Sequence, residues 1–248
     1  MSESPDRQHN KSQAVVLLSG GLDSATVLAI ATSHGHRCHA LTFQYGQRHA
    51  CELRAARSVA GQLAAACHLV VPIPVDLFSN SALTDPSIQV PQEPGPAAEI
   101  PVTYVPARNL AFLSLAVAYA ESIRATAVYI GANAVDYSGY PDCRPEFIAA
   151  FEKAACLATR TGVEGTPIAI KAPIISMSKR DIIALGTELG VNYALTHSCY
   201  DPDPATDAAC GCCDSCRIRR QAFLDAGVPD PTRYTGDVCE EPPGTTSR

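Results

Sequence analysis

A glycine-rich turn, SGGLDS at residues 19–24, combines residue types that can bind an anion. It follows the apolar run AVVLL (14–18), a candidate buried strand, and precedes a segment that favours a helix. Glycines let the backbone turn tightly, and free amides at a helix start point toward phosphate oxygens. Ser19 and Ser24 carry hydroxyl donors, and Asp23 can cap the helix or help to hold Mg²⁺. These features predict a phosphate-binding loop.

Two adjacent glycines alone are equally compatible with an ordinary strand-to-helix turn capped by serine or aspartate. The sequence contains no Gly-Lys-Ser/Thr element, which excludes the Walker-type phosphate loop. The residues that we expect at the nucleotide are Leu18, Ser19, Gly20, Gly21, Leu22, Asp23, Ser24, Ala25 and Thr26.

A second group with chemical potential is a cysteine cluster toward the C-terminal end. Cys210, Cys213 and Cys216 follow a C-x2-C-x2-C spacing, and Cys199 lies eleven residues upstream of the first. Four thiolates can surround one tetrahedral ion, so we predict a zinc site at these cysteines. Four protein ligands leave no coordination position for water or substrate, which indicates a structural site.

Three alternatives to this ligand set remain open. Cys212 could pair with Cys216, although the even two-residue spacing favours Cys213. An iron–sulfur cluster fits the beginning of the pattern, but position 220, where a ferredoxin has its fourth cysteine, is arginine. Buried thiols or a disulfide are disfavoured because the first 13 residues lack an apolar export segment. We expect the basic residues Arg217, Arg219 and Arg220 to offset part of the thiolate charge.

The amino-acid composition indicates which class of protein this is and which kind of partner it binds. The chain has 248 residues, of which 46% are hydrophobic and 18% are charged, as in an α/β domain with a small appendage. A net charge of -6 with 19 basic residues disfavours a nucleic-acid-binding surface and favours a small-molecule partner. The longest apolar stretch, near residues 110–120, is too short to span a bilayer, so we expect a cytoplasmic protein without a membrane partner.

The elements that must position these residues alternate between short apolar runs and longer amphipathic segments, which is typical of a parallel α/β sheet. The predicted strands are 14–18, 38–43, 68–75, 127–132 and 167–173. The predicted helices are 24–34, 49–63, 109–122, a helix beginning at Pro145, and one from the capping box Ser178–Asp181 to about residue 190.

The domain organisation follows from the same pattern. Residues 76–107 are rich in proline and polar groups and are expected to form a lid over the carboxyl ends of the strands. We predict a nucleotide-binding domain at 12–190, a cysteine-rich zinc-binding subdomain at 191–238, and flexible ends at 1–11 and 239–248.

The string SGGLDS at the first strand-to-helix junction resembles the loop of the N-type ATP pyrophosphatases (PP-loop proteins), which cleave ATP between its α- and β-phosphates. This resemblance implies a Rossmann-like adenine nucleotide alpha hydrolase fold, with ATP as co-substrate and Mg²⁺ as cofactor. Lys179 is similar to a phosphate-contacting lysine of that superfamily, although a solvated surface lysine is the alternative. Asp23, Ser24 and Lys179 are therefore candidate catalytic residues.

Further stretches resemble the 7-cyano-7-deazaguanine synthase (QueC) family: LLSGGLDS, TFQYGQRH (42–49), TYVPARNL (103–110), GANAVDYSGYPDCRPEF (131–147), SCY and CGCCDSC. The resemblance implies that 7-carboxy-7-deazaguanine, ammonia and ATP are converted through an adenylate and an amide to a nitrile for queuosine synthesis. It also implies zinc on the four cysteines named above, and a cytoplasmic homodimer.

Residues within the matched stretches are candidates for substrate contacts. Arg108 is a catalytic candidate that could pair with ATP phosphates or the substrate carboxylate, although an ordinary arginine at a helix start is the alternative. Tyrosines of YSGYPDCR could stack on a planar deazaguanine. The predicted substrate-binding residues are Tyr137, Ser138, Gly139, Tyr140, Asp142 and Arg144, with Asp142 accepting from the guanidine-like edge and Arg144 meeting the carboxylate.

Other positions in these stretches carry weaker expectations. Cys143 has no evident His and Asn/Asp partner set, so we interpret it as a packing residue rather than a nucleophile. Ala107 stands where many relatives have glycine, which constrains the backbone before the following arginine. The residues expected beside the nucleotide by resemblance are Tyr45, Gln47, Arg48 and His49.

Other functions remain possible at the level of sequence. A thiolating tRNA enzyme would need an RNA-binding surface, and a glutamine-dependent amidotransferase would need a glutaminase domain; neither fits this short acidic chain. A relative that adenylates a protein carboxylate is a closer rival. A zinc-bearing binding protein without turnover is a different class, and pyrophosphate release would distinguish it.

Overall fold

The computed structural model describes residues 11–46, 51–91, 99–134 and 139–236. None of the helices described there is long and apolar enough to span a lipid bilayer. In chain order the elements are β1 (Gln13–Leu17), α1 (Leu22–Ser33), β2 (Arg37–Gln44), α2 (Cys51–Gln62), β3 (Cys67–Pro72), the 3₁₀ helix η2 (Val75–Phe78), α3 (Arg108–Ser122), β4 (Ala127–Tyr129), the 3₁₀ helix η3 (Pro141–Cys143), α4 (Pro145–Ala158), α5 (Arg160–Val163), β5 (Ala169–Lys171), α6 (Lys179–Glu188), the 3₁₀ helix η4 (Tyr193–Leu195) and α7 (Asp214–Ala226).

Five parallel strands form one sheet in the order β3-β2-β1-β4-β5, which confirms the predicted parallel α/β fold. The central strand β1 places Val15 opposite His39 of β2 and Val128 of β4. The chain moves outward from β1 to β3 and then returns to the other side of β1. Ligands of open α/β sheets bind at such a reversal, beyond the carboxyl ends of the strands.

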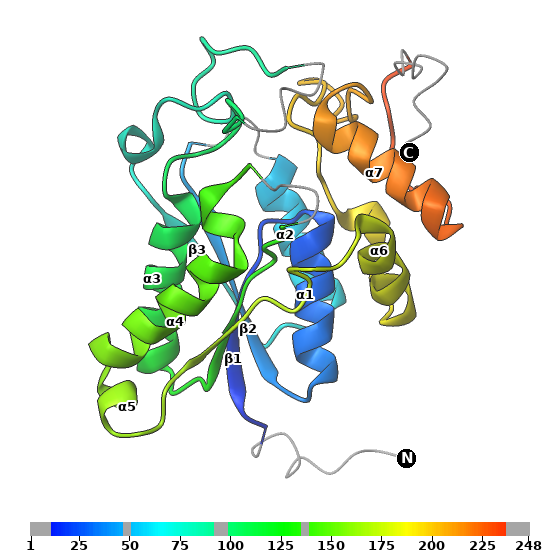
Figure 1. The fold of residues 1–248 in the computed structure, drawn as a ribbon. Helices are drawn as coiled ribbons and strands as arrows, with labels where there is room; N and C mark the ends of the chain where they lie inside the picture. The colour runs from blue at the N-terminus through cyan, green and yellow to red at the C-terminus, as the bar shows by residue number, and fades with distance from the viewer. Residues whose placement is uncertain (1–10, 47–50, 92–98, 135–138, 237–248) are drawn as a thin grey trace, which may run out of the picture.

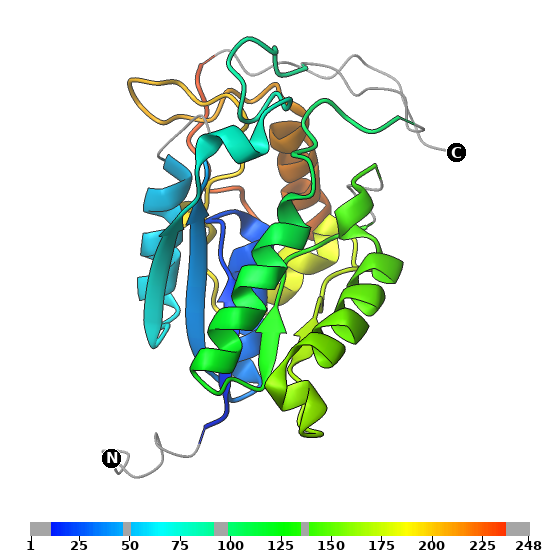
Figure 2. The same cartoon turned by 90° about the vertical axis from the view of Figure 1, so that its left-hand side faces the viewer.

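Side chains of β1 alternate between two cores, because successive residues of a strand point to opposite faces of the sheet. Val15 and Leu17 pack with residues of α3 and α4, whereas Val16 and Leu18 pack with residues of α1, α6 and α7. Figures 1 and 2 show helices on both faces of the sheet. Each fully buried aliphatic side chain contributes about 1.5–3 kcal/mol to this packing.

Most predicted elements occur, with different bounds for physical reasons. Helix α1 begins at Leu22 rather than residue 24, because Gly21 serves as its N-cap. The Ser178 side chain accepts the amide of Asp181, and Pro145 is the first residue of α4, so both predicted helix starts are confirmed. Strands β4 and β5 have only three residues each, and β3 ends at Pro72.

Two predictions on organisation, the lid and the flexible ends, fall partly outside the described residues. The expected lid contains the end of η2 and irregular turns, while residues 92–98 lie outside the described residues. Much of both predicted flexible ends also lies outside them. The division of the chain into domains at residue 190 stays a prediction. In Figures 1 and 2 the segments after β3 and before α7 lie at the end of the sheet opposite the N-terminus.

A close approach between α6 and α1 fixes the position of α6. The hydroxyl of Tyr193 lies 2.8 Å from Thr26 Oγ1 on α1 and donates to the Ile182 carbonyl on α6, at 3.1 Å. A Cβ atom at Gly186 would lie 1.9 Å from that hydroxyl and 2.8 Å from Thr26 Oγ1. Only glycine therefore leaves room for the tyrosine between the two helices.

Two glycine-to-alanine changes within helices should have opposite effects. Gly186→Ala should lower the free energy of unfolding by about 2 kcal/mol or more, because the new methyl group displaces Tyr193. Gly61→Ala, on the exposed side of α2 with no atom within 4 Å of the added Cβ, should raise it by about 0.5–1 kcal/mol. Urea unfolding midpoints of both variants measure the difference. Equal stability of the two would contradict the tight packing at residue 186.

Candidate nucleotide site and thiolate centre

A cavity of about 250 Å³ lies beyond the carboxyl ends of β1, β2 and β4. Its lining includes the phosphate loop, the beginning of α3, Lys179 of α6 and residues from the cysteine-rich segment. Leu83, from the predicted lid, also lines it. The structure therefore brings the two chemically distinctive parts of the sequence to one place, at the reversal of the strand order.

The phosphate loop is held in shape by its own hydroxyls. Ser24 Oγ accepts the amide of Ser19 at 3.2 Å, lies 3.1 Å from Ser19 Oγ and donates to the Gly21 carbonyl at 3.0 Å. Gly20 has φ +93°, and a Cβ there would lie 2.5 Å from the carbonyl oxygen of Glu52. Only glycine satisfies both constraints, so the loop can lie directly against α2.

Asp23 and Lys179 form an ion pair across 156 residues of sequence. The ammonium donates to both carboxylate oxygens, at 3.0 and 2.8 Å, and Lys179 is only 5% exposed. The N-cap of α1 is Gly21, and both carboxylate oxygens of Asp23 accept from Lys179, so the geometry does not favour the helix-cap alternative. The solvated-lysine alternative also fails, because a buried ammonium requires such a partner.

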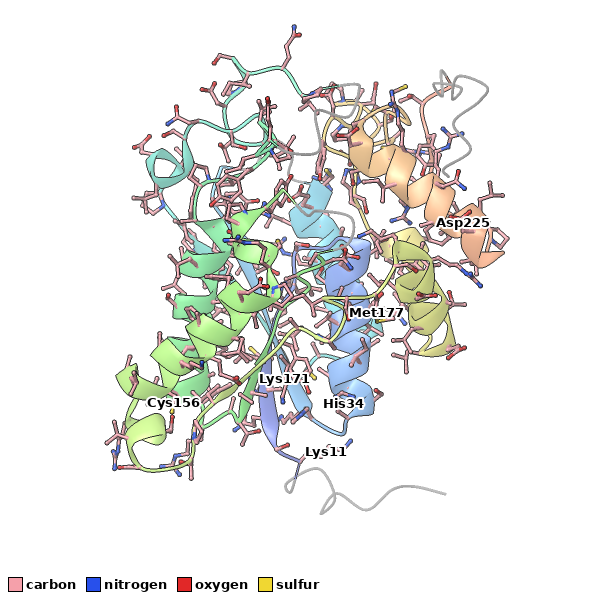
Figure 3. All side chains as sticks on the ribbon, viewed as in Figure 1. Lys11, His34, Cys156, Lys171, Met177 and Asp225 are labelled. Carbon is pink, nitrogen blue, oxygen red and sulfur yellow. The ribbon has the colours of Figure 1, made fainter. Side chains whose placement is uncertain are left out.

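Asn133 holds the segment that delivers Lys179. Its side-chain amide donates to the carbonyls of Ile174, at 2.9 Å, and Met177, at 2.7 Å. Figure 3 labels Lys171 and Met177, which bracket the chain between β5 and α6. Asn133 is 2% exposed, and sequence reasoning did not single it out, because its partners are carbonyls more than 40 residues away.

The cavity lining also carries a basic and an acidic side chain from α3 and α2. Arg108, the first residue of α3, donates to the hydroxyl of Tyr45 at 3.1 Å. Glu52, in the first turn of α2, also lines the cavity. Burial raises the pKa of Glu52 to about 7, although the nearby arginine acts in the opposite direction. Sequence analysis missed Glu52; its only signal was its position just after the stretch TFQYGQRH.

Ala107 immediately precedes this arginine and has φ +53°, in the left-handed region that favours glycine. This conformation costs an alanine about 1–2 kcal/mol, because its Cβ atom comes too close to the following carbonyl oxygen. The expectation that alanine constrains the backbone at this position therefore agrees with its conformation.

The stretch YSGYPDCR reaches the cavity only in part. Tyr140 and Cys143 line it, whereas Tyr137 and Ser138 lie outside the described residues, as do Gln47, Arg48 and His49. The hydroxyl of Tyr140 lies 2.8 Å from that of Thr103. Burial raises the pKa of the Cys143 thiol to about 11, which favours a packing role over a nucleophile.

The remaining predicted substrate residues do not line the cavity. Asp142 is buried and accepts the amide of Asn109 at 2.9 Å, so its carboxylate caps the beginning of α3. Arg144 is exposed, and its Nε donates to the Pro141 carbonyl at 3.1 Å. Gly139 lies beside the lid, where an added Cβ would be 2.7 Å from Pro101 Cδ. These three assignments stay predictions that the geometry does not favour.

The four predicted thiolate ligands come together. The Sγ atoms of Cys199, Cys210, Cys213 and Cys216 lie within 4.8 Å of one another. The Sγ–Sγ distance is 3.5 Å between Cys199 and Cys210 and 4.0 Å between Cys210 and Cys216. Four sulfurs at bonds of about 2.3 Å around a tetrahedral zinc ion would be about 3.8 Å apart, so the set fits a metal site. Cys212 does not belong to the cluster.

One of the three arginines expected to offset the thiolate charge, Arg219, has a different role. Arg219 is 2% exposed, and its Nε donates to Asp230 at 3.2 Å. The same guanidinium donates to the Tyr193 carbonyl at 3.1 Å and to Thr196 Oγ1 at 2.9 Å. The expectation that Arg219 offsets the thiolates is therefore corrected, because its charge is balanced by an aspartate. Arg220 lies over the ring of Tyr234, with 5.8 Å between Cζ and the ring centroid.

Comparison with known proteins agrees with this geometry. The family described as "Queuosine biosynthesis protein QueC" matches residues 13–227. The 7-cyano-7-deazaguanine synthase of Methylococcus capsulatus is 60% identical over 221 residues, which cover 89% of this chain and 98% of the relative. That of Frankia casuarinae is 59% identical over 219 residues, which cover 88% and 92%.

One similar solved structure supports the fold but not the function. It is a 4-thiouridine synthetase in complex with RNA and bound ATP, 17% identical, with a TM-score of 0.50 over 87% of this chain and 50% of that chain. The family match and the relatives, by contrast, each cover most of the chain. The chain therefore belongs to the QueC family of queuosine biosynthesis enzymes.

Proposed function

We propose that this enzyme converts 7-carboxy-7-deazaguanine, ammonia and ATP into 7-cyano-7-deazaguanine, through an adenylate and an amide, for queuosine precursor synthesis. The relatives named 7-cyano-7-deazaguanine synthase support the overall reaction. The observation that carries the mechanism is the buried Lys179–Asp23 pair at the phosphate loop, inside a cavity that Arg108 also enters. Two cations in an enclosed site can bind the phosphates and the carboxylate together.

Adenylation follows from the position of the loop at the beginning of α1. Free amides and the positive end of the helix dipole favour the ATP phosphates at this point. The substrate carboxylate attacks the α-phosphate, and pyrophosphate leaves with its charge stabilised by the loop amides and Lys179. Asp23 and the phosphate oxygens form the donor set that Mg²⁺ commonly takes, and the ion would neutralise the departing pyrophosphate.

The planar base requires a flat apolar wall, and aromatic residues provide one. Phe43, Tyr45, Phe112 and Tyr140 all line the cavity. Phe43 and Phe112 stack on each other, with ring centroids 4.1 Å apart. A deazaguanine could stack against such rings while its carboxylate pairs with Arg108. The homodimer and the cytoplasmic location that the resemblance implies remain predictions.

The four-thiolate centre is proposed to hold a structural zinc ion. Tyr200 and Ser215, which line the cavity, lie beside the ligands Cys199 and Cys216 in the sequence. The metal would cross-link two segments that otherwise depend on few apolar contacts, since the buried cluster around the cysteines is small. Its role is therefore to shape one wall of the cavity rather than to take part in chemistry.

The complete reaction tests the proposed function. With ATP, Mg²⁺, ammonium and 7-carboxy-7-deazaguanine, the protein should release pyrophosphate and AMP and form first the amide and then the nitrile. The synthetic amide should bypass the first half and still require ATP, because its oxygen leaves only after activation. Mass spectrometry and pyrophosphate assays measure these products. Release of ADP and phosphate would refute the adenylate, and failure with both substrates would favour the relative that adenylates a protein carboxylate.

Removal of the lysine in the ion pair should damage adenylation specifically. Lys179→Ala should lower substrate-dependent ATP–pyrophosphate exchange by about a hundredfold, the usual scale for losing a transition-state electrostatic partner. Lys171→Ala, on the exposed end of β5, is the matched control and should leave the exchange unchanged. Thermal unfolding of both variants separates lost chemistry from lost folding. Exchange at the wild-type rate in a folded Lys179→Ala variant would exclude the lysine from the phosphate site.

The ligand assignment can be tested by metal analysis. Wild-type protein should contain about one zinc ion per chain, and Cys213→Ser should lose most of it together with thermal stability. Cys212→Ser should retain the metal. Cys156→Ser, on α4 and distant from α7 in Figure 3, provides the baseline for a cysteine change. Iron with sulfide, or metal loss in Cys212→Ser instead, would overturn the assignment.

A further inference from the structure

Two carboxylates line the cavity in the described part of the chain, and they differ in their partners. Both oxygens of Asp23 accept from Lys179. Glu52 makes no side-chain hydrogen bond or salt bridge with the residues that the structure describes. Its backbone carbonyl lies against Gly20 of the phosphate loop, so α2 begins beside the loop and Glu52 lines the same cavity.

The charged and titratable groups around Glu52 come from several elements. Arg108 faces it from α3, Tyr45 from the end of β2, and Cys51 from its own helix. The ion pair of α1 and α6 lies elsewhere in the cavity lining, as does His197. Burial disfavours the carboxylate form while the arginine favours it, and the pKa is about 7. A group balanced in this way can both accept and release a proton near neutral pH.

The proposed reaction requires a proton acceptor in both nitrogen steps, because ammonium carries four protons on its nitrogen and a nitrile none. Ammonium must lose a proton before its nitrogen can attack the adenylate, and the activated amide must lose its nitrogen-bound protons to become a nitrile. The other titratable side chains of the lining are less suited. Arg108 and Lys179 are cations, Asp23 is paired, and burial raises the pKa of Tyr45 and Cys143. His197 also lines the cavity and is the rival that the experiments below include.

We propose that Glu52 is the proton acceptor for both nitrogen steps, an inference that rests on the proposed function. In the first step its carboxylate takes a proton from ammonium, the freed electron pair forms the C–N bond, and the C–O bond to AMP breaks with its electron pair leaving on AMP. Glu52 passes this proton to water and then takes the excess proton from the new amide nitrogen.

In the second adenylation the amide oxygen displaces pyrophosphate from ATP, and the amide nitrogen keeps two N–H protons. Glu52 takes these two protons one after the other and passes the first to water; the electron pair of the last N–H bond completes the C≡N bond while the C–O bond to AMP breaks with its electron pair leaving on AMP.

The test separates adenylation from nitrogen transfer in single-turnover experiments. Glu52→Gln keeps the shape of the side chain and should release the first pyrophosphate at close to the wild-type rate. Its formation of amide and nitrile should fall by about a hundredfold or more, the scale of general base catalysis. Glu188→Gln, at the exposed end of α6, is the matched control and should behave as wild type.

Two further readouts distinguish proton transfer from a structural effect. Wild-type conversion of the synthetic amide to the nitrile, a step that uses no ammonium, should slow as the pH falls below about 7, because the active form is the carboxylate, and Glu52→Gln should lose this dependence. Hydroxylamine, a nucleophile that is largely unprotonated at neutral pH, should trap the adenylate of Glu52→Gln at close to the wild-type rate.

Failure of this inference and failure of the proposed function would give different experimental results. Wild-type rates of nitrile formation in Glu52→Gln, or loss of its first pyrophosphate release, would overturn the inference and leave the overall reaction intact. Loss of the pH dependence in His197→Gln alone would assign the proton transfer to the histidine instead. Absence of amide and nitrile in the wild-type protein would refute the proposed function itself.

Discussion

The buried Lys179–Asp23 pair is the constraint on which the site depends. An ammonium that is 5% exposed needs a nearby anion, so α6 must be fixed against α1 within a fraction of an ångström. Tyr193 bridges the two helices, and Asn133 anchors the chain that enters α6. Gly186 leaves the space that the tyrosine needs. Residues remote from the substrate thus set the geometry of the phosphate loop.

A second set of buried polar contacts joins the cysteine-rich segment to the nucleotide-binding sheet. Arg219 connects the Tyr193 carbonyl, which lies next to α6, with Asp230 near the end of the described chain. Because a buried guanidinium is costly unless its donors are satisfied, this network favours one arrangement of α7. The thiolate cluster lies at the beginning of that helix. The position of α7 therefore affects both the geometry of the thiolate cluster and that of the cavity wall.

Charge within the cavity differs from the charge of the whole chain. The protein has a net charge of -6, yet two basic side chains, Arg108 and Lys179, line the cavity, where they suit the phosphate and carboxylate groups of the proposed ligands. Asp23 reduces the effective charge of the lysine, and burial raises the pKa of Glu52 to about 7. An enclosed site strengthens each of these interactions, because water screens them less than it would at the surface. Net charge alone is thus a poor guide to such a site.

Local chemistry in the sequence determined the phosphate loop, the capping of α6 by Ser178, the proline at the start of α4 and the spacing of the cysteines. These features involve neighbours along the chain, so residue type and spacing suffice to predict them. Tertiary structure alone decided that Asp23 meets Lys179, that Asp142 caps α3 rather than lining the cavity, and that Glu52 enters it. Such pairings depend on how distant helices pack, which no local pattern specifies.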